Sequence, residues 1–128
     1  MKWRRARINL ELETNVNPFP NDADGEALQR VANDGSDMSK PMLINFQVAA
    51  PNEATAKALA DAAYKNGYQV SIYFSPECSL PWTCECSTQM LATYEGVTAV
   101  QKELAELSVP FGGHCDGWGT FGNNPHCQ

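Results

Sequence analysis

Hydrophobic periodicity from residue 42 onward constrains the fold of this chain more than any other feature of the sequence. Residues 42 to 49, 68 to 74 and 82 to 90 alternate apolar and polar side chains. This two-residue period is typical of half-buried β-strands. Residues 52 to 66 and 93 to 107 instead repeat their apolar side chains every three or four positions, which predicts two amphipathic α-helices.

A last strand is expected over residues 109 to 121, so the order from residue 42 is strand, helix, strand, strand, helix, strand. That order is typical of the ferredoxin-like split βαββαβ sandwich, in which both helices cover one face of an antiparallel sheet. In this plan the first and third strands are central, and the second and fourth strands form the edges. We therefore predict an α+β domain of the ferredoxin-like class.

Two elements are added before this sandwich. The segment from Arg5 to Glu13 alternates apolar and polar side chains, which predicts a further strand. Such a strand could cover a sheet edge or pair across a homodimer axis. Asp22 or Asp24 can cap a short helix that ends near Asn33.

Charge divides the chain into a basic N-terminal arm, residues 1 to 21, and a single α+β domain, residues 22 to 128. Four of the nine basic residues fall within the first seven positions, whereas the net charge of the whole chain is −6. An acidic domain repels phosphate groups, so we expect no direct nucleic-acid binding. The same charge favours a basic protein partner, although acidic surfaces often serve solubility alone.

Targeting and membrane signals are not apparent in the sequence. No apolar run approaches the roughly 18 residues that a membrane-spanning helix needs. The basic start resembles the beginning of a signal peptide, but polar residues interrupt the apolar stretch that would have to follow. We therefore expect a cytoplasmic protein without a membrane partner.

Five cysteines raise the question of disulfides, a metal site or a nucleophile. An odd number without an export signal argues against a disulfide framework. Cys84 and Cys86 would share a strand face, but two strand spacings, about 9.6 Å, would separate Cys84 from Cys115. His114 and Cys115 are neighbours and would point to opposite faces. We therefore interpret Cys84 and Cys86 as buried core residues, and we expect no catalytic residue, metal or other cofactor.

The segment from Phe111 to Phe121 contains four glycines among eleven residues. Because glycine weakens a strand interior, this cluster predicts a β-bulge, a sharp bend or a close approach to the backbone. Asp116 and Trp118 would share one face of the distorted strand. Trp118 could cap the core, with its indole N–H bound to a backbone carbonyl, or it could anchor a protein interface.

Four motifs point to a known family. They are Asp34-Gly-Ser-Asp37, Lys65-Asn-Gly-Tyr68, Trp82-Thr-Cys-Glu-Cys86 and Phe111-Gly-Gly-His-Cys-Asp-Gly-Trp-Gly119. With these motifs the chain resembles the regulator of ribonuclease E activity B family over roughly residues 22 to 122. The resemblance implies a ferredoxin-like fold with an N-terminal helix. It also implies a non-enzymatic protein that binds the scaffold region of ribonuclease E and dampens or redirects messenger RNA decay.

We therefore expect a non-catalytic protein-binding regulator whose partner is ribonuclease E or a related RNA-decay assembly. An acidic surface would meet an arginine-rich segment of the partner, with Asp116 and Trp118 near the contact. Two other classes stay open at this point: a self-associating binding module for an unrelated partner, and a small metal-binding protein.

Overall fold

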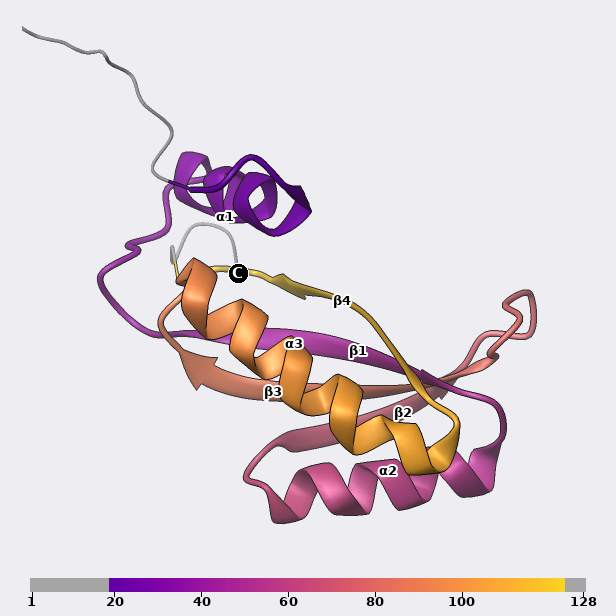
Figure 1. Ribbon diagram of the computed structural model, residues 1–128. Coiled ribbons are helices and arrows are strands. Elements are labelled where there is room, and N and C mark those ends of the chain that lie inside the picture. The colour runs from indigo at the N-terminus through magenta and orange to yellow at the C-terminus, as the bar shows by residue number, and fades with distance from the viewer. Residues whose placement is uncertain (1–18, 124–128) are drawn as a thin grey trace, which may run out of the picture.

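A four-stranded antiparallel sheet organises the fold (Figure 1). Its strands are β1 (Met42–Ala50), β2 (Gln69–Phe74), β3 (Trp82–Met90) and β4 (His114–Thr120). Their order is β2-β3-β1-β4, which confirms that the first and third strands are central and the other two are edges. The computed structural model describes residues 19–123, so the strand expected from Arg5 to Glu13 lies outside the described residues.

Three helices complete the α+β architecture: α1 (Ala23–Asn33), α2 (Glu53–Lys65) and α3 (Tyr94–Ser108). Each begins after a residue whose side chain accepts a hydrogen bond from a backbone amide of the first turn, namely Asp22, Asn52 and Thr93. The predicted cap and end of the short first helix are thereby confirmed. Within residues 19–123, no helix combines the length and the apolar character needed to cross a membrane.

The core lies between the sheet and the helices. Helix α2 packs against β2 and β3, α3 packs against β1 and β4, and α1 packs against α3 at one end of the sandwich (Figure 1). The largest fully buried side chains are Leu28 of α1, Met42, Ile44, Phe46 and Val48 of β1, Leu59 of α2 and Leu104 of α3. Cys84 and Cys86 are fully buried among them, which confirms their interpretation as core residues.

The last strand begins later than the sequence predicts. Residues Val109–Phe111 form a short 3-10 helix, η1, instead of the start of β4. Pro110 fixes its own φ and lacks a backbone N–H, so it suits the first turn of a helix better than a sheet ladder. Gly112 then ends the turn with a left-handed φ of 69°. The expected strand over residues 109 to 121 is therefore wrong in its first residues.

A β-bulge interrupts β4, as the glycine cluster predicts. Phe46 of β1 lies opposite Trp118, whereas Val48 lies opposite Cys115. Between these pairs, two residues of β4 face a single residue of β1. One of the two is Gly117, whose φ of 108° is a left-handed conformation that glycine adopts without steric cost.

Candidate functional site

Asp116 and Trp118, the residues expected to contact a partner, belong to opposite faces of β4. Trp118 is half-buried and packs against the core, as does Cys115. Asp116 follows Cys115 directly and is exposed, so strand alternation turns it away from the core. The expectation that the two residues share a face is wrong because Gly117 adds one residue to the strand between them.

The indole of Trp118 is part of a polar connection to α1. Its N–H donates to Oδ1 of Asp24 at 3.0 Å, and not to the expected backbone carbonyl. The second oxygen of Asp24 accepts a hydrogen bond from Gln101 of α3 at 3.1 Å. The hydroxyl of Tyr94 donates to Oδ2 of Asp22 at 2.6 Å. Together these contacts hold the first turn of α1 against β4 and α3.

We use the term open face for the sheet surface opposite the helices. Leu28, Leu59 and Leu104, one from each helix, belong to the same core cluster as the alternate side chains of β1. All three helices therefore lie on one side of the sheet, and within residues 19–123 none covers the other side. The open face consists of Leu43, Asn45, Gln47 and Ala49 of β1, Gln69, Ser71 and Tyr73 of β2, Thr83, Glu85, Ser87 and Gln89 of β3, and His114, Asp116, Gly117 and Gly119 of β4.

Glu85 occupies the centre of the open face, between Gln47 and Ser71 of the neighbouring strands. The amide of Gln47 donates to Oε2 of Glu85 at 2.9 Å, and the hydroxyl of Ser71 donates to Oε1 at 3.4 Å. Burial alone would raise the pKa of Glu85, but hydrogen bonds from Tyr73, Gln47 and Ser71 outweigh it and lower that pKa. The carboxylate is therefore ionised at neutral pH. Sequence reasoning did not single out this residue.

Tyr73 offers a direct test of this network. Burial, together with the hydrogen bond to Glu85, raises the pKa of Tyr73 to about 12, from an ordinary value of 10.0. Replacing Glu85 by glutamine removes the negative charge that disfavours the tyrosinate, so we expect the Tyr73 pKa to fall toward its ordinary value. Alkaline titration of tyrosine absorbance, with the Tyr73→Phe variant subtracted, measures the shift. An unchanged Tyr73 pKa in the glutamine variant would contradict the contact.

A groove of about 610 Å³ extends the open face at one end of the sheet. It is lined by Pro41, Met42, Leu43, Gln89, Phe121, Gly122 and Asn123. Leu43 and Gln89 are paired across β1 and β3, so the groove is continuous with the open face. Phe121 lines it with a side chain that is 79% exposed. An apolar pocket of this kind can receive a large side chain from another molecule.

Two glycines of β4 leave open space on this side of the sheet. A Cβ atom at Gly117 or at Gly119 would meet no other atom within 4 Å. Gly119 lies opposite Asn45, and Gly117 is one of the two bulge residues opposite Gln47. The side chain of Asn45 therefore stands next to backbone without a side chain, whereas Gln47 lies beside Gly117 and the exposed Asp116.

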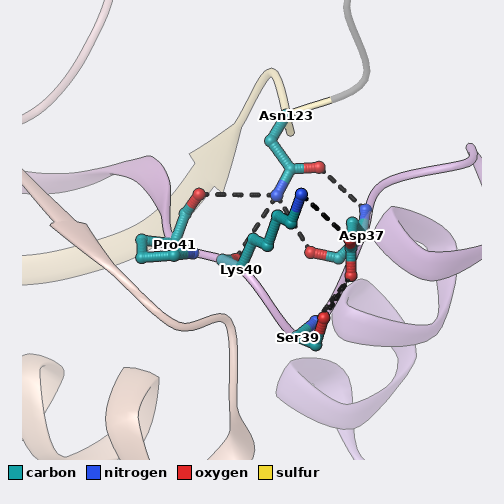
Figure 2. A network of polar contacts seen from close by, with 5 residues as sticks. All are labelled: Asp37, Ser39, Lys40, Pro41 and Asn123. Carbon is teal, nitrogen blue, oxygen red and sulfur yellow. Dashed lines mark hydrogen bonds and ion pairs between the residues drawn. The ribbon is translucent and has the colours of Figure 1, made fainter.

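Asn123 fixes one wall of the groove (Figure 2). Its side-chain amide donates to the carbonyl oxygens of Asp37, Lys40 and Pro41 at 2.9, 3.3 and 3.4 Å, and its oxygen accepts the backbone N–H of Asp37 at 2.8 Å. The carboxylate of Asp37 accepts hydrogen bonds from the hydroxyl and the backbone N–H of Ser39, which lower the Asp37 pKa. The turn before β1 is thus tied to the segment that follows β4.

The cysteines of the described part are Cys78, Cys84, Cys86 and Cys115. The sulfurs of Cys84 and Cys86 lie 3.8 Å apart in the core. This contact and burial raise the pKa of Cys86, and burial raises the pKa of Cys115. Within residues 19–123, no group of three or more histidine, cysteine or acidic residues is placed to hold a metal ion. The metal-binding alternative therefore has no ligand set in that part of the chain.

Thiol labelling should separate these cysteines by exposure. Cys78 is exposed in the loop between β2 and β3, whereas Cys84 and Cys86 are buried. We expect an alkylating reagent at neutral pH to modify Cys78 at once, and Cys84 and Cys86 only after denaturant is added, because the reagent cannot reach a thiol that is buried in the core. Peptide mass mapping measures the order. Rapid alkylation of Cys86 in the folded protein would contradict its placement in the core.

Comparisons with known proteins agree with the motifs in the sequence. A family model described as Regulator of ribonuclease activity B matches residues 21–120, a span that includes every helix and strand described above. Proteins of that name from Actinobacillus succinogenes and Haemophilus influenzae are each 29% identical over 106 residues, which cover 80% of this chain and 75% and 69% of theirs. The one from Xenorhabdus nematophila is 26% identical over 102 residues, covering 77% of this chain and 72% of its own. The chain therefore belongs to the regulator of ribonuclease activity B family.

Proposed function

We propose that this protein is a non-catalytic regulator that binds ribonuclease E, at a region outside its catalytic domain, and so modulates messenger RNA decay. The observation that carries the proposal is the family match over residues 21–120. The relatives are named as regulators of ribonuclease activity, and such a role requires contact with a ribonuclease. A regulator of this kind would act in the cytoplasm, as the sequence analysis expects.

The charge of the domain supports a basic partner surface. Residues 19–123 carry thirteen acidic and five basic side chains, which gives a net charge of −8 at neutral pH. Complementary charge accelerates association and selects partners more than it adds affinity, and salt screens it. An arginine-rich scaffold segment of ribonuclease E would complement the negative charge of this domain.

Within this proposal, Asp116 and Trp118 have different roles. Asp116 is exposed and can contact the partner directly. Trp118 packs against the core and donates to Asp24, so its contribution is to position β4. We therefore place Asp116 in the contact and Trp118 behind it.

We also infer that the domain is a ferredoxin-like sandwich. The antiparallel order β2-β3-β1-β4 supports this, as do the positions of α2 between β1 and β2 and of α3 between β3 and β4. Because this architecture serves many unrelated functions, the proposed function does not rest on it.

A binding and cleavage assay tests the proposed function. The full chain is titrated against intact ribonuclease E and against its isolated catalytic domain, at low and at high salt. We expect binding to the intact enzyme that weakens as salt rises, slower RNA cleavage, and no effect on the catalytic domain alone. Absence of binding at low salt would rule the proposal out, and inhibition of the isolated catalytic domain would exclude a site outside it.

The predicted homodimer contact needs its own measurement because Arg5 to Glu13 lies outside the described residues. Light scattering of the full chain, and of the chain without residues 1 to 20, reports the oligomeric state. A dimer that becomes a monomer after this deletion would support the contact.

A further inference from the structure

We propose that the open face and the groove at its end form one docking surface for an extended basic segment of the partner protein. One arginine or lysine of that segment pairs with Glu85, and a large apolar side chain four residues away enters the groove beside Phe121. The inference rests on the proposed function, because it names the surface with which the regulator would hold the ribonuclease.

Charge on the open face selects a basic side chain. Glu85 and Asp116 are its two carboxylates, and the open face contains no lysine or arginine. Glu85 is held by neutral donors, which leave its negative charge uncompensated. The three ion pairs of the described part, Lys40–Asp37, Lys57–Glu53 and Lys65–Asp61, do not include either residue. A cation arriving from a partner would therefore find a fixed, ionised carboxylate.

The groove selects a large apolar side chain. Leu43 and Phe121 line it, and Phe121 exposes most of its ring to solvent. Burying such a ring against an incoming aromatic or aliphatic group removes apolar surface from water on both molecules. Asn123 holds the adjoining turn in place through its contacts with the backbone, so the groove is formed before a ligand arrives (Figure 2).

The distance between the two features sets the shape of the ligand. Leu43 pairs with Gln89 at the groove, and Gln47 pairs with Glu85 at the centre of the face. Four residues along a strand span about 13 Å. In an extended segment lying along β1, side chains four positions apart point the same way and reach both features. Gly119 of β4 leaves room for its backbone beside Asn45.

Two variants test this surface without disturbing the core. Glu85→Gln removes the charge while keeping the shape, and we expect affinity for intact ribonuclease E to fall about three- to tenfold. Gly119→Arg places bulk and positive charge on the open face opposite Asn45, where an added Cβ meets no atom within 4 Å. We expect it to weaken binding more than tenfold. Glu106→Gln, which changes an exposed carboxylate on α3, is the matched control and should bind as the unaltered chain does.

A second experiment, with synthetic peptides, tests the docking surface separately from the proposed function. The probe is a nine-residue synthetic peptide with tryptophan and arginine four positions apart, compared with one in which they are three apart. We expect the full chain to bind the first peptide more tightly, and Glu85→Gln and Gly119→Arg to abolish that preference. If ribonuclease E binds the chain and both variants equally, the proposed function stands and this surface is wrong. If ribonuclease E does not bind but the peptide preference holds, the surface stands and its assignment to that enzyme fails.

Two other occupants would overturn the proposal, and the same measurements reveal them. The basic arm of this chain would compete with the peptide, so peptide binding would appear only after Arg4, Arg5 and Arg7 are replaced by glutamate. A second copy of the chain would appear in light scattering as a dimer that Gly119→Arg dissociates. Circular dichroism and thermal midpoints matching the unaltered chain establish that each variant is folded.

Discussion

Replacing Phe46 by alanine is expected to lower the free energy of unfolding by about 3–5 kcal/mol. Phe46 is fully buried in β1, the central strand that joins β3 to β4, and it lies opposite Cys86 on one side and Trp118 on the other. Removing its ring takes apolar surface from the core and leaves a cavity that the close-packed side chains around it cannot readily fill. Urea denaturation followed by circular dichroism measures the loss.

Two variants of the same strand set the scale for this result. Phe46→Leu keeps most of the volume, so we expect a loss below about 1.5 kcal/mol. Leu43→Ala truncates a half-buried side chain on the open face, and it should also cost less than Phe46→Ala because less surface is buried there. If Phe46→Ala were no more destabilising than Leu43→Ala, the assignment of the two sheet faces would be wrong.

The elements that sequence analysis places well are those whose determinants are local. Alternation over residues 42 to 49 predicts β1 because one face of that strand packs against helices while the other does not. The short first helix follows from Asp22, whose carboxylate needs only the amide of Gly25, three residues away. The order of such elements then restricts the sheet to few arrangements, and the central position of β1 and β3 follows.

What sequence analysis misses depends on contacts between distant residues. A glycine cluster predicts a bulge but not its position, and that position decides the faces of Asp116 and Trp118. Glu85 meets Gln47 across 38 residues, and Trp118 meets Asp24 across 94. The Cys84-Glu85-Cys86 alternation shows that Glu85 points away from the core, but its partners appear only once the strand register is known.

Replacing Trp118 by alanine is expected to cost about 3 kcal/mol of stability, near the low end for tryptophan because the side chain is only half-buried. The same change removes the hydrogen bond that Asp24 accepts from the indole, so the first turn of α1 should open more often than the rest of the domain. Urea denaturation measures the global loss, and hydrogen exchange of the α1 amides measures the local one. Trp118→Phe keeps an aromatic ring in the core but loses the N–H and part of the indole, so a smaller loss of about 1–2 kcal/mol is expected.

Binding measured on these variants separates the two roles considered for Trp118. If the residue only positions β4, Trp118→Phe should bind the ribonuclease as the unaltered chain does, while Asp116→Asn weakens binding and leaves the global stability little changed. If Trp118 is itself an interface anchor, Trp118→Phe should lose affinity at nearly full stability, as anchors of this type do. The hydrogen bond to Asp24 favours the first outcome, because an indole whose N–H is already bound within the domain has no polar group left to offer a partner.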